Sequence, residues 1–310
     1  MNIRAFLTVL LAGFFFGSSL IASRFGVGQF NAFVFVGLRF TIAGVCFLSV
    51  YLLFQRRHPW PKDTRLWLQA ATMGLIGTGI PTAAIVGSLL FQSSGVTSIL
   101  VTTGPALTVV LAHFFLPGEV LTWRKVFGVL LALSGALLVT IRGETGLPDV
   151  TEANPLGYGL VVLALLCFSG MTIYTRKYMR TYDSFDVTSI QVFASALVIM
   201  PLVTVFIGLD FTNVTWLGYT ALAYAGIVST FFGFILFFAI VRNYGATTAA
   251  MTNYVVPVAA SLGGILLLNE QFTVGMLAGM GLTLIGIALI NYRPLSEQAA
   301  EIKQPVKVDY

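Results

Sequence analysis

One long apolar segment occurs twice in the chain, and this duplication limits the folds open to it. Residues 105–142 read PALTVVLAHFFLPGEVLTWRKVFGVLLALSGALLVTIR, and residues 257–293 read PVAASLGGILLLNEQFTVGMLAGMGLTLIGIALINYR. Five residues match at an offset of 151 positions: Glu119, Thr122, Gly128, Gly135 and Arg142 match Glu270, Thr273, Gly279, Gly286 and Arg293. The opening prolines are 152 positions apart. Such repetition predicts a fold built from two similar units.

Composition places the chain in a membrane. Hydrophobic residues make up 57% and charged residues 9% of the sequence, and the mean hydropathy is +0.90, whereas soluble domains carry about 25% charged residues. Several uncharged runs exceed the ~18 residues needed to cross a bilayer. We predict an all-α polytopic membrane protein with ten transmembrane helices, near 5–23, 30–54, 66–91, 96–116, 126–141, 156–175, 187–209, 216–241, 246–268 and 272–292.

A hydrophilic connector, RGETGLPDVTEANP, divides these ten runs into two sets of five. We therefore expect a first five-helix repeat at 1–142, an extracytoplasmic connector at 143–155 and a second repeat at 156–293. The polar segment 294–310 has no sustained period, so it is predicted to be a disordered cytoplasmic tail. The first run is of full span length and lacks an A-x-A cleavage pattern, so we interpret it as a span and not a signal peptide.

The positions of the basic residues predict the orientation. With a cytoplasmic N-terminus, 14 of the 17 Lys and Arg residues fall on the inside, Arg24 and Arg142 fall outside, and Arg39 lies within a span. The positive-inside rule then predicts that both termini are cytoplasmic. Since five spans is an odd number, the second repeat is inverted relative to the first, as in many secondary transporters. This bias also accounts for the net charge of +5 without a nucleic-acid partner.

Short motifs around the repeat resemble a known family. The sequences FFLPGEVLT and LLLNEQFT end two matching spans, Phe-Gly-Ser stands at 16–18, and Arg39 lies in GLRFTIAG. Together these features resemble the EamA domain of the drug/metabolite transporter superfamily, present as two tandem domains over nearly all of 5–293. The resemblance implies a ten-helix bundle around a central cavity, alternating access and an inner-membrane location. Members of this family move amino acids, nucleotide sugars, drugs and other metabolites.

Matching prolines mark two candidate cavity walls. Pro105 and Pro257 lie inside the fourth and ninth spans, where a proline frees backbone carbonyls. Freed carbonyls are tolerated in a membrane only when they are buried or line a cavity. Polar neighbours favour cavity lining and are Thr102, Thr103, Asn253 and Tyr254. The alternative is a kink that only serves packing.

Small polar residues in other paired spans are further candidates. Ser18, Ser19, Ser169 and Thr172 lie in the first and sixth spans and can either bind substrate or let helices approach closely. Thr78 and Thr230 lie in glycine-rich parts of the third and eighth spans, which favours bending.

Arg39 is the most informative single residue. A charge inside a span is costly, so it normally faces the bundle interior or water and serves function. Two roles are open: binding a substrate carboxylate, or acting as a structural or gating clamp.

No Asp or Glu lies deep in any span, so we do not expect obligatory proton coupling through a carboxylate.

Three polar residues lie near span ends. His113 can titrate near neutral pH, with an inter-helix hydrogen bond as the alternative. Glu119 and Glu270 end matching spans on opposite membrane faces, each before a Thr that can cap the next helix. We interpret the two glutamates as structural turns, with gating as the alternative.

Glycines spaced seven apart in the fifth and tenth spans predict helix-packing surfaces, either within the chain or between chains. We expect a monomer, with a homodimer as the alternative. Cys46 and Cys167 lie in mid-span, so neither a disulfide nor a Cys-based metal site is indicated, and no cofactor is expected.

The inverted repeat predicts a secondary transporter for small metabolites, and the family resemblance implies that it works by alternating access in the bacterial inner membrane. Its partners would be a small-molecule substrate and the lipid bilayer. Amino acids or related compounds are the expected substrates and export the expected direction. The alternatives are a multidrug or nucleotide-sugar carrier and a membrane-embedded enzyme. The enzyme is disfavoured because one His at a span end cannot assemble a metal site or a catalytic triad.

Overall fold

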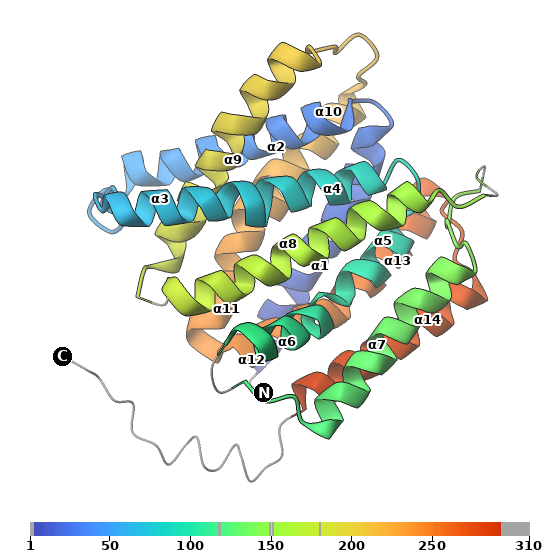
Figure 1. Ribbon diagram of the computed structural model, residues 1–310. Helices are drawn as coiled ribbons and strands as arrows, with labels where there is room; N and C mark the ends of the chain where they lie inside the picture. The colour runs from blue at the N-terminus through green and yellow to red at the C-terminus, as the bar shows by residue number, and fades with distance from the viewer. Residues whose placement is uncertain (1–2, 117–118, 149, 151, 180, 293–310) are drawn as a thin grey trace.

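The computed structural model describes residues 3–116, 119–148, 150, 152–179 and 181–292, and in this part of the chain it contains helices and no strand. The helices form one bundle (Figure 1). They are α1 (Ile3–Val27), α2 (Ala32–Leu53), α3 (Thr64–Met73), η1 (Gly74–Gly79), α4 (Ile80–Ser88), α5 (Ser94–Thr102), α6 (Gly104–Phe115), α7 (Trp123–Ile141), α8 (Pro155–Tyr178), α9 (Ser184–Phe206), α10 (Trp216–Ala223), η2 (Tyr224–Phe232), α11 (Gly233–Tyr244), α12 (Ala246–Ala250), α13 (Thr252–Leu268) and α14 (Val274–Asn291).

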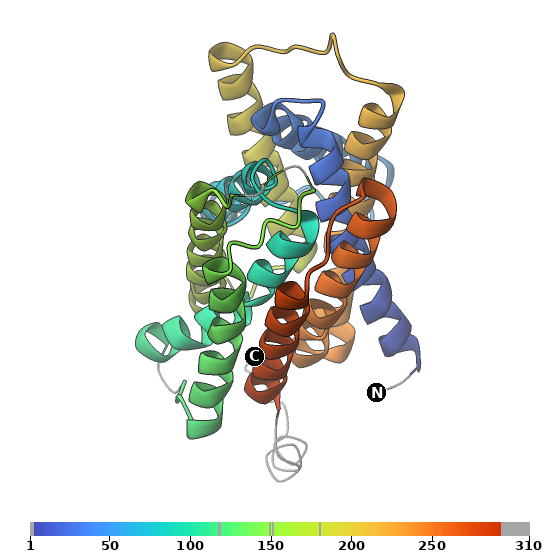
Figure 2. The same ribbon diagram turned by 90° about the vertical axis from the view of Figure 1, so that its right-hand side faces the viewer.

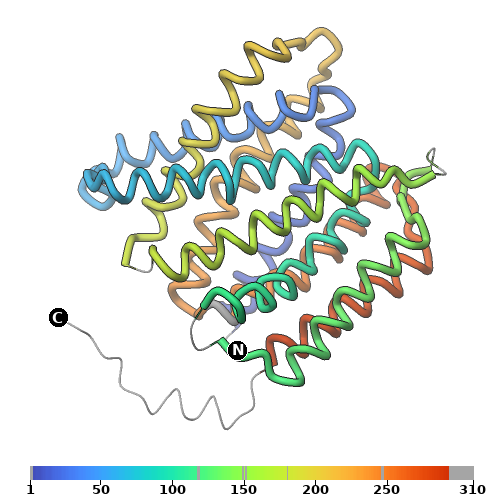
Figure 3. Tube along the Cα trace, viewed as in Figure 1, coloured from blue at the N-terminus to red at the C-terminus, as the bar shows by residue number. Residues whose placement is uncertain are grey.

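The ten predicted spans are confirmed as elements of the structure. Within the described residues, ten helical stretches are long and apolar enough to cross a membrane. Four of the spans are composite: α3–η1–α4, α5–α6, α10–η2–α11 and α12–α13. Figure 3 shows the third span as a continuous path through its central π-helical segment. The remaining six spans are single α-helices.

Side-chain caps begin eight of the ten spans and explain where these spans start. The threonine that follows each repeated glutamate has the predicted role: Thr122 accepts a hydrogen bond from the Lys125 amide at 3.4 Å, and Thr273 accepts one from the Met276 amide at 3.1 Å. Such caps satisfy amides that have no partner within the helix. The sequence motif therefore fixes the starts of α7 and α14.

Packing between helices follows the duplication. The pairs α2–α9 and α7–α14 each join matching spans of the two halves, while α1 packs on α13 and α8 packs on α6. Exchanging the halves leaves the α2–α9 and α7–α14 contacts unchanged and converts the α1–α13 contact into the α6–α8 contact. Figures 1 and 2 both show α7 and α14 side by side at one edge of the bundle. This is the contact pattern expected of two similar repeats that exchange positions about a two-fold axis.

The glycines of the repeated segment form the contact between α7 and α14. A Cβ atom on Gly128 would stand 2.7 Å from the carbonyl oxygen of Gly286, and one on Gly279 would stand 2.8 Å from that of Gly135. Neither distance leaves room for an alanine. These positions match across the repeat, so the same close contact occurs twice. Of the two predicted uses of the glycines, packing within the chain is the one observed.

Candidate functional site

A band of polar contacts joins the two halves in the middle of the bundle, and we call Arg39, Thr78, Gln191 and Thr230 the polar seam. Arg39 Nε donates a hydrogen bond to Thr230 Oγ1 at 2.7 Å, and Thr78 Oγ1 donates one to Gln191 Oε1 at 3.2 Å. Arg39 and Gln191 are 152 positions apart, and so are Thr78 and Thr230. The two hydrogen bonds are therefore the same inter-half contact in two copies.

Both seam threonines lie in π-helical segments. Thr78 belongs to η1 and Thr230 to η2, and a π-helix inside a transmembrane span often marks a functional position. Close backbone approach supports each contact: a Cβ on Gly74 would stand 2.8 Å from Gln191 Cα, and one on Gly226 would stand 3.2 Å from the Arg39 carbonyl oxygen. Glycine is needed at both positions so that the seam can form.

Arg39 is held by hydroxyl groups. Besides Thr230, its Nη1 donates to Ser23 Oγ at 3.2 Å. No carboxylate of the described residues lies within ion-pair distance of it. A guanidinium inside a span needs such donors or acceptors because it is removed from bulk water. Arg39 therefore links α1, α2 and η2. Its positive charge is stabilised by the dipoles of hydroxyl groups and not by a carboxylate.

Two more hydrogen bonds between the halves extend the seam along the first, fourth and sixth spans. Ser18 Oγ lies 2.7 Å from Tyr224 Oη, and Thr108 donates to Ser169 Oγ at 3.0 Å. Ser19, next to Ser18, is buried. The predicted residues Ser18 and Ser169 are thus brought to the interface between the repeats.

Other predicted hydroxyls are satisfied within their own helices. Thr102 donates to the Ser98 carbonyl, Thr103 to the Leu100 carbonyl and Thr172 to the Phe168 carbonyl, each at 2.7 Å. Thr102 and Thr103 are buried, whereas Thr172 is exposed. The structure brings none of the three into a hydrogen bond with the other repeat.

The two polar residues predicted in the ninth span lie away from the seam contacts. Asn253 is half-buried. Tyr254 Oη accepts a hydrogen bond from Asn291 Nδ2 at 3.4 Å. Its side chain also lines a groove of about 420 Å³ between α1, α13 and α14.

The matching prolines differ in their local structure. The fourth span breaks at Thr103, and Pro105 stands in the first turn of α6, so this proline follows the break directly. The ninth span breaks at Met251, and buried Pro257 lies inside α13. Both spans are interrupted, as the prolines suggest, but only Pro105 adjoins its interruption.

Glu119 and Glu270 have different partners. Glu119 pairs with Arg176 at 3.0 Å and with Lys125 at 3.8 Å. Glu270 is 7% exposed and accepts hydrogen bonds from the Ser94 amide at 2.8 Å and the Ser94 hydroxyl at 2.7 Å. The Glu270 carboxylate therefore binds the start of α5, which precedes it in the chain, and the helix that follows it is capped by Thr273.

His113 lies beside the first of these glutamates. Its Nδ1 stands 2.9 Å from the Glu119 carbonyl oxygen, and its side chain is exposed. The described residues contain no group of three His, Cys, Asp or Glu side chains placed to hold a metal ion.

Fold and seam together define a class: a polytopic α-helical membrane protein built from two repeats that contact each other through small polar side chains. The family model described as the EamA-like transporter family matches residues 3–141 and 155–292. The chain belongs to this family of transporters. The drug/metabolite transporter resemblance of its sequence motifs is thereby confirmed.

Individual relatives are distant but cover most of the chain. An uncharacterized transporter of Archaeoglobus fulgidus is 24% identical over 89% of this chain and 94% of its own length. The uncharacterized inner membrane transporter YedA of Escherichia coli K12 is 24% identical, covering 94% and 92%. A protein of Streptantibioticus cattleyicolor named as a probable terminal-alkyne amino-acid exporter is 23% identical, covering 91% of each chain.

A solved crystal structure shares the fold. It superimposes with a TM-score of 0.66 over 94% of this chain and 98% of its own, at 19% identity. Because the identity is low, this likeness supports the fold only.

Sequence reasoning missed several partners in the seam. Tyr224, Ser23 and Thr108 each bind a predicted residue but were not singled out. The repeat offered one signal for such contacts. Gln191 stands where the first half has Arg39, and Thr78 stands where the second half has Thr230, so a contact between Arg39 and Thr230 predicts one between Gln191 and Thr78.

Proposed function

We propose that this chain is a secondary transporter that moves amino acids or related small metabolites across the bacterial cytoplasmic (inner) membrane by alternating access, with export as its direction. Both termini lie in the cytoplasm, and the repeats 1–142 and 156–293 are the two moving units. Solute binds between them near the first, third, fourth, sixth, eighth and ninth spans.

The duplicated seam contact carries the proposal. Arg39–Thr230 and Thr78–Gln191 join the halves through single hydrogen bonds at π-helical segments. A hydrogen bond of this kind contributes about 1 kcal/mol net, or about twice that with a charged partner. Such contacts can be broken and remade as the repeats rock. Contacts of this strength are compatible with alternation between two states of similar energy.

The chemistry of the seam supports a polar, uncharged or zwitterionic solute. Its groups are hydroxyls, an amide and the guanidinium of Arg39. The amino-acid exporter among the relatives agrees with this class. A membrane-embedded enzyme is less well supported, because His113 is exposed and contacts a backbone carbonyl in place of a nucleophile.

The test is solute counterflow into liposomes that contain the purified full-length chain. A panel of amino acids, nucleotide sugars and cationic drugs separates the candidate substrates, and protein-free liposomes give the background. We expect counterflow of amino acids without an imposed pH gradient. Uptake of only drugs or nucleotide sugars would contradict the substrate class, and uptake driven solely by a pH gradient would contradict the uncoupled mechanism.

The role of Arg39 is tested in the same liposomes with Arg39→Ala. If Arg39 binds a substrate carboxylate, the variant loses affinity on the order of tenfold or more. If it acts as a gate, affinity is kept and the ratio of the two transport directions changes. The hydroxyl-only environment of Arg39 is equally compatible with both roles.

A further inference from the structure

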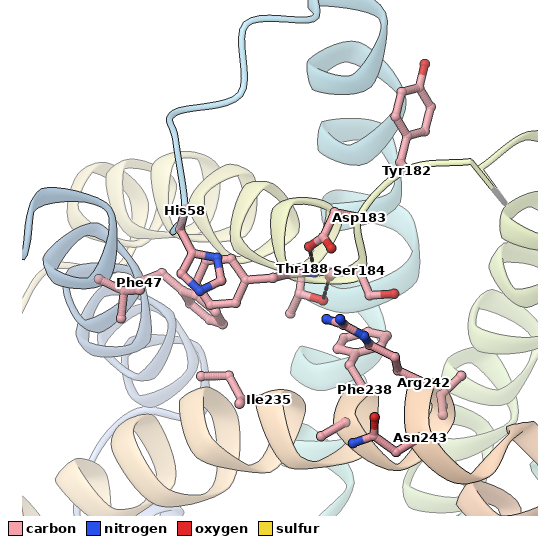
Figure 4. A pocket seen from close by; sticks show the side chains of 14 residues that line it. Phe47, His58, Tyr182, Asp183, Ser184, Thr188, Ile235, Phe238, Arg242 and Asn243 are labelled. Carbon is pink, nitrogen blue, oxygen red and sulfur yellow. Dashed lines mark hydrogen bonds between the residues drawn. The ribbon is translucent and has the colours of Figure 1, made fainter. Parts of the chain in front are cut away.

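A cavity of about 610 Å³ lies away from the polar seam, where α2 ends, α9 begins and α11 ends (Figure 4). Its volume is within the range of small-molecule sites, about 300–1,000 Å³. Phe47, a fully buried residue of its wall, is six residues before the end of α2, which places it about 9 Å along the helix from that end. The cavity therefore reaches from the rim of the bundle into the apolar region.

The inner part of this cavity is aromatic. Phe47 and Phe185 meet with ring centroids 5.3 Å apart, and Phe238 lines the wall contributed by α11. The His58 ring packs on Phe185 in a tilted arrangement, with centroids 4.4 Å apart. Contacts of this kind hold the rings in place before a ligand arrives. They offer a preformed apolar surface to a ring or a branched side chain.

The mouth of the cavity carries two opposite charges that do not pair with each other. Arg242 and Asn243 lie at the end of α11, and Asp183 is the N-cap of α9. In Figure 4 the Arg242 guanidinium points from α11 toward the first turn of α9, where Asp183 and Ser184 lie. In the part of the chain that the structure describes, neither Arg242 nor Asp183 forms an ion pair.

One oxygen of Asp183 is already engaged. Its Oδ1 accepts a hydrogen bond from the Phe185 amide at 2.8 Å, while the carboxylate keeps further acceptor sites. Arg242 has a planar fork of donors that matches a carboxylate in two parallel hydrogen bonds. The two walls thus present an acceptor for an ammonium group and a donor pair for a carboxylate group.

We propose that this cavity is a binding site for a zwitterionic amino acid with an aromatic or large apolar side chain. Arg242 and Asn243 bind its carboxylate, Asp183 binds its ammonium group, and the side chain lies on Phe47, Phe185 and Phe238. The site is separate from the polar seam. Its role as the place where solute enters the carrier rests on the proposed function.

Both charges are needed for this assignment. A simple anion, such as a lipid headgroup, would use Arg242 and gain nothing from Asp183. A simple cation would use Asp183 and be repelled by Arg242. Both side chains are exposed at the mouth, so a ligand that carries only one of the two groups leaves the other charge in water and lacks one of the two charged contacts.

Three probes that differ in one group each test the inference on the purified full-length protein. They are L-phenylalanine, 3-phenylpropionate, which lacks the ammonium group, and 2-phenylethylamine, which lacks the carboxylate. Equilibrium binding is measured for each. We expect L-phenylalanine to bind on the order of tenfold more tightly than either analogue.

Two variants test which side chain binds the carboxylate group of the ligand and which binds its ammonium group. Arg242→Gln is expected to weaken L-phenylalanine about tenfold and to leave 2-phenylethylamine unchanged or tighter. Asp183→Asn is expected to weaken L-phenylalanine similarly and to leave 3-phenylpropionate unchanged or tighter. Asparagine is as good an N-cap as aspartate, so α9 keeps its start. Arg57→Gln, on an exposed arginine outside the cavity, is the matched control and should bind all three probes as the unmodified protein does.

The inference is overturned if both variants bind L-phenylalanine normally, or if 3-phenylpropionate binds as tightly as L-phenylalanine to the unmodified protein. The second result would indicate an anion site. Failure of the cavity and failure of the proposed function are distinguishable. If the predicted binding pattern is found but no counterflow occurs, the cavity is supported and transport is contradicted. If amino acids show counterflow but both variants bind L-phenylalanine normally, transport is supported and the cavity is contradicted.

Discussion

Glu119 and Glu270 occupy the same position of the repeated motif, yet they lie at opposite ends of the bundle in different surroundings. Glu270 is buried against the start of α5, with three donors from Ser94 and Gly95 within 3.4 Å. The Glu119 side chain is 38% exposed and pairs with Arg176 and Lys125 on the surface. The same motif position is therefore buried at the Glu270 end of the bundle, which we call the closed end, and exposed at the Glu119 end, which we call the open end.

The difference lies in what faces each glutamate. At the Glu270 end, Ser93 and Ser94 begin α5 and supply hydroxyl groups, and the first amides of this helix have no partner within the helix. Gly245, which is 152 positions after Ser93, begins α12 with no side-chain cap and stands at φ +86°. The two ends of the bundle therefore present different partners to the same position of the motif.

The first prediction determines which end is cytoplasmic and has an all-or-none outcome. With Cys46 and Cys167 replaced by serine, single cysteines at Thr212 and Arg57 mark the two ends of the bundle. We expect Thr212→Cys to react with a membrane-impermeant maleimide in intact cells and Arg57→Cys to react only after permeabilisation. The reverse labelling would show that the basic residues do not set the orientation.

The second prediction concerns the stability of the closed end. Glu270→Ala leaves buried amides of α5 without an acceptor, so we expect the Tm in detergent to fall by roughly 5–10 °C. Glu152→Ala, on an exposed glutamate in the connector, is the control and should change Tm little. An equal loss in Glu119→Ala would remove the contrast between the two ends.

The third prediction separates the two parts of the Glu270 contact. Ser94→Ala removes the hydroxyl, which donates to Glu270 Oε2 at 2.7 Å and also lies 3.3 Å from the Ala260 carbonyl oxygen, and it keeps the amide hydrogen bond of 2.8 Å. We therefore expect a Tm decrease of about 2–4 °C, smaller than that of Glu270→Ala. A decrease as large as that of the glutamate variant would mean that the hydroxyl, and not the helix amides, holds the carboxylate.

The fourth prediction concerns the open end and has the smallest effect. Surface ion pairs contribute about 0–1 kcal/mol and are screened by salt. Glu119→Gln should lower Tm by about 1–2 °C at low ionic strength and by less in about 1 M salt. A salt-independent loss would indicate that the Arg176 contact is buried in the protein in solution.

Sequence patterns predicted the architecture well, because a membrane leaves few options for the backbone. Ten apolar runs became ten spans, and the break near Pro105 appears at Thr103. The π-helical segments were not predicted. Their glycine-rich sequences indicated bending, but a shift of hydrogen-bond register by one residue depends on tertiary contacts and leaves no compositional trace.

The candidate site was predicted in part. Arg39 stood out because a charge in a span is expensive, and Thr230 was chosen for its glycine-rich surroundings; their mutual hydrogen bond was not foreseen. The aromatic cavity was missed altogether. Asp183 and Arg242 are ordinary charges near helix ends in the sequence, and only the folded chain shows that they share a cavity.

The seam contact described above is duplicated in geometry but not in charge, since Arg39 in one copy is replaced by Gln191 in the other. Moving one elementary charge across the full membrane potential involves about 2.3 kcal/mol per 100 mV. Any rocking motion that carries the Arg39 guanidinium along the membrane normal therefore does electrical work, whereas movement of Gln191 does none. Under the proposed alternating-access mechanism, the balance between the inward-facing and outward-facing states then depends on voltage, even for a solute with no net charge.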